Sequence, residues 1–508
     1  MQRPGTYDAL AWSPERGRAF AEQVLEVWAD YLAAIPTLPV GRADPPATVR
    51  RAVLRPVPDE PLADEEIIAN LHALALEQSL QPGHGGFMAY ITGAGTVPGA
   101  PAALLAAGLN QNLGGSLLSP AATEIETHLL DWFAARFGLP EGSSGAFVAG
   151  GATANFMALA AARAALAGWD VRTDGVAGGP PLAVYASEDC HDTIDRAADL
   201  LGIGTAGVRR IPTDETLRMR PDALARALTE DTAAGVRPLC VVATAGTTEF
   251  GAIDPIDELA ELAAAAGCWL HVDAAYGGPA AMVPDLAAPF AGIERADSIT
   301  CDPHKWLNMP IASSVVLFRN AARHHAAFTL ETDYTRFDAD TADGLLMRYQ
   351  WTPQFSRPFD PLPLWVSLLA HGWQAFAGRI RHDLELAAWL HYLVCAHDEL
   401  VPTISPQLAI VAFRYVPADL AAGGDPARDE AAAGYLDDLN DRIVTTLQRG
   451  GRVFPSNAAY RGRSVIRACI MSYRTEADHL EALVEEVVRV GATLDAARRP
   501  PGLSAADG

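Results

Sequence analysis

The chain of 508 residues is 50% apolar and 20% charged, and it carries 62 acidic against 38 basic side chains, a formal net charge of −24. At roughly 100 to 200 residues per domain, this length predicts two or three folded units and excludes a small binding module. The composition excludes a disordered or fibrous chain. Because the basic residues form no continuous block, nucleic acid and anionic membranes are not expected as partners.

The N-terminal sequence contains no apolar run of signal-peptide length, and the Ala-rich run at 102–109 is far shorter than the roughly 20 residues that a membrane helix needs. The six cysteines are widely spaced, without a CxxC pair or a histidine at metal-binding spacing. We therefore expect a cytoplasmic protein with buried free thiols and no metal ion.

The first part of the chain has the pattern of helices rather than strands. Ser13 and Pro14 are typical of a helix start. Apolar side chains follow at four-residue spacing, namely Phe20, Val24, Trp28 and Leu32. Residues 41–61 are rich in Pro, Arg and Asp and are expected to form a loop, before a second helix around 65–80. Residues 1–96 are thus predicted to form an N-terminal helical arm.

Residues 97–362 alternate short apolar runs with Ala-rich helical stretches, which predicts an α/β domain with a mainly parallel sheet. Seven strands are expected, at 146–148, 182–186, 208–211, 239–243, 269–272, 298–301 and 314–318. Residues 363–508 are expected to form a smaller α+β domain. Its predicted elements are a helix at 364–395, strands near 408–415 and 465–471, and a last helix opening at Thr475 and Asp478.

Two short motifs do not fit the functions that their residues first suggest. Gly202, Gly204 and Gly207 form a GxGxxG, but a dinucleotide site needs a strand before the glycines and a helix after them. Here the order is reversed, so we expect a turn that ends a helix. The pair His324 and His325 has no third ligand at a recognisable spacing and is expected to be solvated.

The strongest chemical signal is a lysine that follows a predicted strand. Lys305 lies just after residues 298–301, where α/β folds bind ligands and where a desolvated amine can form a Schiff base. Asp273 ends the apolar strand at 269–272, and a buried carboxylate needs a cationic partner such as a protonated pyridine. Ala275 offers a small face on which a flat ring can lie.

Three further strand ends carry groups that could bind a phosphate or contact a flat ring. The glycine turn with Gly151 and Ala152 joins a strand to a helix, so backbone N–H groups can bind a phosphate. His191 follows the strand at 182–186, and an imidazole there can stack on a flat ring. Hydroxyls including Thr248 follow the strand at 239–243. A lysine, an acid, an anion-binding turn, an imidazole and hydroxyls together indicate pyridoxal 5'-phosphate.

The sequence around these residues resembles the group II, fold-type I pyridoxal-phosphate decarboxylases, and most of all the aromatic L-amino acid decarboxylases. The resemblance covers nearly the whole chain. It rests on the contexts of His191, Thr248, Asp273, Ala275 and Lys305, on 84–90 with His84, Phe87, Ala89 and Tyr90, on 119–124, and on 467–474. It implies a carboxy-lyase that converts an L-amino acid to an amine and CO2.

The resemblance implies four catalytic residues. Lys305 would bind the cofactor covalently, and Asp273 would pair with its ring nitrogen. His191 would stack on the ring. Tyr334, in the stretch 332–344, matches a tyrosine of the family's catalytic loop, which would supply a proton to the substrate carbon.

The resemblance also implies further contacts to the cofactor. Gly151 and Ala152 would bind its phosphate through the backbone, and Ala275 would lie on the ring face opposite His191. Thr248 would lie near a ring substituent, and His304 matches the family's histidine beside the lysine. Asp302 stands where asparagine is frequent, and Ala152 where serine is common, and neither change should prevent binding.

The substrate and the outcome of the reaction stay open at this point. Phe87 and Tyr90 suggest an aromatic or apolar substrate pocket, whereas an acidic amino acid would require a deep cationic group, for which Arg467 is a candidate. Relatives that make aldehydes typically replace His191 or Tyr334, and this chain keeps both. An aminotransferase or a carbon–sulfur lyase could use the same lysine and acid.

A homodimer is expected for two reasons. Ser356 matches a position that reaches the phosphate in the other subunit of the family's dimers. The first predicted helix has an apolar face without an obvious partner in the same chain. Residues 1–96 are therefore placed at the dimer interface, beside a large domain at 97–362 and a small domain at 363–508.

Overall fold

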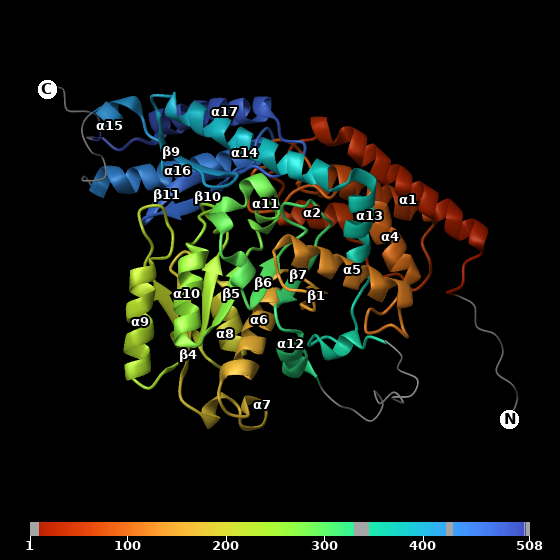
Figure 1. The fold of residues 1–508 in the computed structure, drawn as a ribbon. Helices are drawn as coiled ribbons and strands as arrows, with labels where there is room; N and C mark the ends of the chain where they lie inside the picture. The colour runs from red at the N-terminus through yellow and green to blue at the C-terminus, as the bar shows by residue number, and fades with distance from the viewer. Residues whose placement is uncertain (1–9, 330–344, 423–429, 502, 504–508) are drawn as a thin grey trace, which may run out of the picture.

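The computed structural model describes residues 10–329, 345–422, 430–501 and 503 (Figure 1). Along the chain, a helical arm is followed by a large layered α/β region and then by a smaller region with its own sheet. None of the helices in these ranges combines the length and the apolar character that crossing a bilayer requires.

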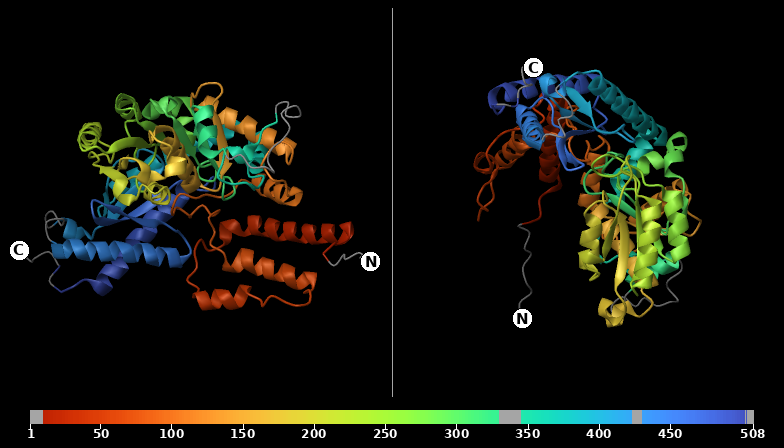
Figure 2. Two further views of the ribbon diagram at one scale, coloured as in Figure 1. Left: turned by 90° about the horizontal axis from the view of Figure 1, so that it is seen from below. Right: turned by 90° about the vertical axis from the view of Figure 1, so that its left-hand side faces the viewer.

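The N-terminal arm consists of short helices that lie side by side and project from the rest of the chain (Figure 2). They are α1 (Pro14–Ala34), η1 (Ile35–Thr37), α2 (Pro46–Val53), α3 (Asp64–Ala73) and a π-helical turn, η2 (Leu74–Gln78). The Ser13 hydroxyl accepts a hydrogen bond from the Arg16 amide at 3.2 Å, which confirms the predicted start of α1. The expected loop at 41–61 was wrong in part, because Pro46 opens α2 at a position that tolerates proline.

All seven predicted strands of the large sheet are confirmed. They are β1 (Ser144–Val148), β2 (Leu182–Ser187), β3 (Val208–Ile211), β4 (Arg237–Thr244), β5 (Trp269–Asp273), β6 (Ser298–Cys301) and β7 (Ser314–Phe318). The order is β1-β7-β6-β5-β4-β2-β3, and β7 alone runs against the others. The carboxyl ends of six strands therefore meet at one edge of the sheet.

Both faces of this sheet are buried, since alternate residues of each strand belong to two different apolar clusters. In β4, Val241 and Ala243 face one cluster, whereas Cys240 and Val242 face the other. The first face is covered by α5 (Pro120–Arg136), α9 (Pro221–Ala233) and α10 (Ile256–Ala266), whereas α14 (Trp373–Cys395) packs mainly against elements of the C-terminal region. The second is covered by α6 (Gly151–Leu166), α8 (Thr193–Leu200) and α12 (Ala321–Phe328). Burial on both sides explains the continuous apolar runs that predicted the strands.

The described part of this region also contains further helical elements. They are α4 (Gly99–Leu109), α7 (Val171–Asp174), η3 (Val176–Gly178), η4 (Thr205–Gly207), α11 (Gly278–Ala281), η5 (Pro284–Leu286), η6 (Ala288–Phe290), η7 (Ile293–Arg295) and η10 (Arg348–Gln350). The glycines at 202, 204 and 207 lie between α8 and β3, which confirms the predicted turn.

The expectation that His324 is solvated was wrong. Its side chain is fully buried and stacks on Phe318, with 3.9 Å between the ring centroids. Its two ring nitrogens bond the Ser144 hydroxyl at 2.9 Å and the Trp351 carbonyl at 2.8 Å. The histidine is therefore part of the core between α12 and β7, and the groups that hold it are far from it in sequence.

The C-terminal region contains a four-stranded antiparallel sheet in the order β10-β11-β9-β8. Its elements are α13 (Pro361–His371), α14, β8 (Leu400–Pro402), β9 (Ile410–Tyr415), α15 (Ala418–Ala422), α16 (Glu430–Gly450), β10 (Ser456–Tyr460), β11 (Arg463–Cys469) and α17 (Ala477–Arg498). The single helix expected at 364–395 is broken at Gly372, whose φ of 70° favours glycine. Glu476 caps α17, whereas Thr475 donates its hydroxyl to the Gly85 carbonyl instead.

Candidate active site

A cavity of about 250 Å³ lies at the carboxyl ends of β1, β2, β4, β5 and β6. We call it the strand-end cavity. It brings together most of the residues that the sequence analysis selected, although these are up to 154 positions apart. The lining residues are Gly150, Gly151, Ala152, Asn155, His191, Thr193, Thr244, Gly246, Thr248, Asp273, Ala275, Tyr276, Asp302, His304 and Lys305.

Lys305 forms an ion pair inside this cavity. Its Nζ lies 3.0 Å from Oδ2 of Asp302, one helical turn earlier. Burial disfavours the ammonium ion, but the carboxylates of Asp302 and Asp273 outweigh burial and raise the pKa of Lys305. Asp302 thus stabilises the charged form of this amine, against the desolvation that favours the neutral form.

Asp273 is held in a fixed orientation at the end of β5. Its Oδ2 accepts a hydrogen bond from Nδ2 of Asn155 at 2.8 Å, and its Oδ1 accepts one from the Ala275 amide at 3.1 Å. The residue is 7% exposed. A buried carboxylate with both oxygens bonded only to neutral donors still needs a cation, which a ligand with a protonated ring nitrogen supplies.

The N-terminus of α6 forms one wall of the cavity. Gly150 precedes the helix with a φ of 101°, a conformation that a side chain would strain. The helix begins at Gly151, so the amides of Gly151 and Ala152 belong to its first turn. The first N–H groups of a helix have no partner within the helix and can bind a phosphate.

The remaining lining groups also suit a polar, phosphate-bearing ligand. Oγ1 of Thr244 is buried and has no hydrogen-bond partner among the described residues. A buried hydroxyl without a hydrogen-bond partner lowers the stability of the folded protein, unless a ligand forms a hydrogen bond with it. Together with Lys305, Asp273 and the start of α6, it fits pyridoxal 5'-phosphate, for which these groups would be the covalent, ring-nitrogen and phosphate partners.

Two histidines border the cavity from different strand ends. Nδ1 of His191 lies 3.1 Å from both the hydroxyl and the amide of Thr193. Nδ1 of His304 lies 2.6 Å from the Ser313 carbonyl and 3.3 Å from the Ser313 amide, and Nε2 lies 3.9 Å from Oδ2 of Asp302. Hydrogen bonds thus hold both imidazoles at the edge of the cavity.

Arg467 is buried beside the cavity but is used by backbone groups. Its guanidinium donates to the carbonyls of Thr248 at 2.6 Å, Glu249 at 2.9 Å and Tyr90 at 3.0 Å. A further hydrogen bond reaches Oγ of Ser456 at 3.3 Å. These four hydrogen bonds stabilise the buried Arg467 cation. They also connect β11 to the loop that carries Thr248.

Three of the predicted site residues do not line the strand-end cavity of the single chain. Phe87 is 2% exposed and stacks on Phe454, whereas Tyr90 is 59% exposed. Ser356 is exposed and does not line this cavity. Tyr334 lies outside the described residues.

The sequence analysis assigned no role to Asn155, Thr193 or Thr244. Asn155 could have been noticed, because an asparagine in the interior of an Ala-rich helix disfavours helix formation and so suggests a specific hydrogen bond. Nothing in the sequence marks the unsatisfied hydroxyl of Thr244, since that depends on which groups the fold places around it.

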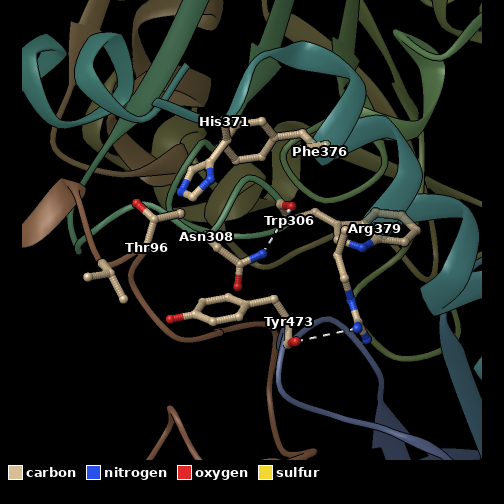
Figure 3. A pocket seen from close by; sticks show the side chains of 9 residues that line it. Thr96, Trp306, Asn308, His371, Phe376, Arg379 and Tyr473 are labelled. Atoms are coloured by element: carbon tan, nitrogen blue, oxygen red, sulfur yellow. Dashed lines mark hydrogen bonds between the residues drawn. The ribbon is translucent and has the colours of Figure 1, made fainter. Parts of the chain in front are cut away.

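A second cavity, of about 230 Å³, has Trp306 in its lining (Figure 3). We call it the Trp306 cavity. It is lined by Thr96, Val97, Trp306, Asn308, His371, Ala375, Phe376, Arg379 and Tyr473. Its cation is already paired, because Nε of Arg379 donates to Asp383 at 2.8 Å and the Trp306 indole donates to the same carboxylate at 2.8 Å.

Comparisons with known proteins agree with this geometry. A family model described as the pyridoxal-dependent decarboxylase conserved domain matches residues 46–416. An aromatic-L-amino-acid decarboxylase from Bacillus atrophaeus is 31% identical over 486 residues, which cover 94% of this chain and 97% of that protein. A phenylacetaldehyde synthase from Arabidopsis thaliana is 28% identical over 476 residues, covering 92% of this chain and 94% of that protein.

A solved structure agrees with the predicted fold-type I architecture. The crystal structure of Oryza sativa TDC with PLP and tryptamine has a TM-score of 0.88 and 26% sequence identity, and the match covers 96% of this chain and 100% of that one. The fold prediction is thereby confirmed. Because the family model also spans well over half of its length, the chain belongs to the pyridoxal-dependent decarboxylase family.

Proposed function

We propose that this enzyme decarboxylates an aromatic L-amino acid to the corresponding amine and CO2. The observation that carries the proposal is the convergence of Lys305, Asp273 and the first turn of α6 on one cavity. Among its relatives, an aromatic-L-amino-acid decarboxylase and several tryptophan and tyrosine decarboxylases support the substrate class.

Each residue has a defined task in this proposal. Bound pyridoxal 5'-phosphate supplies an electron sink for the electron pair that departing CO2 leaves on the substrate carbon. Lys305 would hold the cofactor, Asp273 would keep its ring nitrogen protonated, and the amides of Gly151 and Ala152 would hold its phosphate. His191, Ala275, Thr248 and His304 would contact the ring and its substituents.

Proton delivery completes the reaction. Tyr334 is the proposed proton donor to the substrate carbon, as its sequence context indicates. His191 is proposed to orient the substrate carboxylate through Nε2, because its Nδ1 is engaged by Thr193 at 3.1 Å.

The state of Arg467 supports an aromatic rather than an acidic substrate. A glutamate or aspartate side chain would need a cation with free donors. Arg467 directs four of its five N–H donors to three carbonyls and a hydroxyl, so bidentate binding of a substrate side-chain carboxylate would break existing hydrogen bonds. Phe87 and Tyr90 remain the proposed apolar side of the substrate pocket in the assembled enzyme.

An aldehyde synthase is the second candidate, because a phenylacetaldehyde synthase is among the relatives. Retention of both His191 and Tyr334 favours simple decarboxylation. Measuring amine against aldehyde and ammonia in the product separates the two activities, and release of a keto acid would instead indicate an aminotransferase.

We also propose a homodimer in which Ser356 reaches the partner's phosphate site and residues 1–96 form part of the interface. Leucines of α4 and the following loop are 52 to 60% exposed, namely Leu104, Leu105, Leu109, Leu117 and Leu118. Such a group of exposed leucines is costly in a monomer. The domain division at 96 and 362 and a cytoplasmic location are kept as proposals, the latter supported by six free cysteines.

The proposed function is tested with purified wild type and Lys305→Ala. We expect the wild type to show the visible absorption of bound cofactor and to release CO2 from L-tryptophan, L-tyrosine or L-phenylalanine, but not from L-glutamate. Lys305→Ala should lose both the covalent cofactor and the activity. A wild type that stays colourless with excess cofactor would refute the proposal.

A further inference from the structure

A chain of buried hydrogen bonds leads from the interior of the large sheet to Asp273. The Trp269 indole donates to Oγ of Ser298 at 2.8 Å, and Ser298 lies 2.9 Å from Nδ1 of His271. Nε2 of His271 lies 3.0 Å from Oδ1 of Asn155, and Nδ2 of Asn155 donates to Asp273 at 2.8 Å. All five residues are at most 7% exposed.

The fold brings these side chains into one layer. Trp269, His271 and Asp273 alternate along β5 and so point to the same face of the sheet, the face that α6 covers. In the parallel pair β5–β6, Ser298 is the register partner of His271. Asn155 reaches this layer from α6, one turn after the helix start.

The position of each proton in this series of hydrogen bonds follows from the carboxylate at its Asp273 end. A carboxylate only accepts, so Nδ2 of Asn155 donates to Asp273 and Oδ1 of Asn155 accepts from Nε2 of His271. Nδ1 of the neutral imidazole then accepts the proton of the Ser298 hydroxyl, whose oxygen accepts from the Trp269 indole. The proton of neutral His271 is then on Nε2 and points at Oδ1 of Asn155. The Thr300 hydroxyl donates to the same oxygen at 2.9 Å, which fixes the amide with its NH2 group toward Asp273.

Asn155 also connects to the second predicted ring contact. Its other Nδ2 proton is donated to Oγ1 of Thr193 at 3.0 Å. The Thr193 hydroxyl is therefore free to give its proton to Nδ1 of His191, which leaves Nε2 of His191 protonated. One amide thus orients both the carboxylate and the imidazole that are expected to contact the cofactor ring.

From this geometry we propose that Asn155 and His271 are positioning residues, which set the orientation and charge of Asp273 and the tautomer of His191 for the bound cofactor. This inference rests on the proposed function. Burial lowers the pKa of His271 to about 4, although Asp273 opposes this shift, so the imidazole is neutral at physiological pH as the hydrogen bonds require.

We call the series of hydrogen bonds from Trp269 to Asp273 the relay. Replacing Asn155 tests the relay in two ways, by cofactor binding to the apoprotein and by catalysis. Asn155→Leu keeps the size of the side chain but removes both donors and the acceptor. We expect the apoprotein to bind pyridoxal 5'-phosphate about tenfold more weakly, with kcat lowered more than KM is raised, since about 1.4 kcal/mol corresponds to each factor of ten. The dissociation constant is measured by titrating apoprotein with cofactor, and kcat by CO2 release.

A matched control separates positioning from stability. Asn440 is another fully buried asparagine, whose Oδ1 accepts from the Tyr415 amide at 2.8 Å in the small region. Asn440→Leu should lower the thermal unfolding temperature like Asn155→Leu, yet leave cofactor affinity within about twofold of wild type. If Asn155→Leu has wild-type cofactor affinity and wild-type kcat, the relay is refuted.

Two substitutions of His271 give a second test that does not depend on the folding of Asn155→Leu. His271→Gln retains an N–H near the position of Nε2 and should preserve cofactor affinity, whereas His271→Leu should weaken it about as much as Asn155→Leu. Equal affinities for the two His271 variants would overturn the inference. A wild type that binds cofactor but releases no CO2 would instead refute the proposed function and leave the affinity test of the relay valid.

Discussion

The strand-end cavity and the Trp306 cavity are similar in size, at about 250 and 230 Å³, and consecutive residues, Lys305 and Trp306, line one each. They differ in how their polar groups are satisfied. Around the Trp306 cavity, Arg379, Trp306 and Asp383 satisfy one another. Among the described residues of the strand-end cavity, the Thr244 hydroxyl has no hydrogen-bond partner, and Asp273 has no cationic partner as close as Lys305 is to Asp302. A catalytic site is therefore recognised by converging groups that await a ligand, rather than by volume.

The largest expected effect is a loss of kcat. It should appear when the buried carboxylate beside the strand-end cavity is neutralised, but not when the one beside the Trp306 cavity is. Asp273→Asn should lower kcat by about 10² to 10³, because an amide cannot keep the cofactor's ring nitrogen protonated. Asp383→Asn should leave kcat within about threefold of wild type. Both are measured as CO2 release under saturating cofactor. Equal losses in the two variants would contradict the distinction between the cavities.

Asp383 also predicts a dependence of stability on pH. Burial raises its pKa to about 6, although Arg379 and Trp306 oppose the shift. The folded protein thus keeps this proton to a higher pH than the unfolded chain does, whose value is near 3.8. Its contribution is complete below about pH 4 and is lost as the pH rises through 6, at about 1.4 kcal/mol per pKa unit, or about 3 kcal/mol in all.

The measurement compares chemical unfolding of wild type and Asp383→Asn across this pH range. The free energy of unfolding of wild type should fall relative to that of the variant between pH 4 and 6. A constant difference between the two would show that Asp383 titrates alike in the folded and unfolded chains.

How fully a strand is buried explains which strands could be predicted from the sequence. The seven strands of the large sheet were predictable because both of its faces are buried, which makes a strand such as β4 a continuous apolar run. The strands β8 and β10 were not predicted, since β8 has three residues and β10 is an edge strand with polar positions. Local pattern is weak in such strands, and pairing with β9 and β11 makes them strands.

The site divides in a similar way. Lys305, Asp273 and His191 were predictable because each lies at, or a few residues beyond, the carboxyl end of a strand, where α/β folds bind ligands. The partners of these residues depend on the fold itself. Whether Asn155 meets Asp273 is decided by the face on which α6 packs, and whether Asp302 meets Lys305 by the turn that follows β6. These contacts join residues of different elements, so no local pattern encodes them.

A smaller effect, of about one factor of ten, is expected at the ion pair of the strand-end cavity. Asp302→Asn removes the carboxylate that raises the pKa of Lys305, so a larger fraction of the amine is neutral at pH 7. Cofactor should then combine with the apoprotein about tenfold faster, followed by visible absorption in stopped flow.

Ser314→Ala is the matched control for this change. Its hydroxyl donates to Oδ1 of Asp302 at 2.6 Å, so the variant perturbs the same carboxylate but keeps its charge. We expect a much smaller change in rate than in Asp302→Asn. Slower cofactor binding by Asp302→Asn would indicate that the carboxylate orients Lys305 more than it holds its proton.

The smallest expected effect is the change in stability on removing the Thr244 hydroxyl. Its dependence on cofactor tests whether the unsatisfied group in the strand-end cavity binds the ligand. Thr244→Val removes a buried hydroxyl without a protein partner, so the apoprotein should gain up to about 1 kcal/mol of stability. In the cofactor-bound protein this gain should shrink or reverse, because the hydroxyl then has a ligand to bond. Ser187→Ala removes another buried hydroxyl without a described partner, but one that does not line the cavity, so its effect should be the same with and without cofactor. If Thr244→Val behaved like Ser187→Ala in thermal unfolding of both forms, the hydroxyl of Thr244 would have no part in binding the ligand.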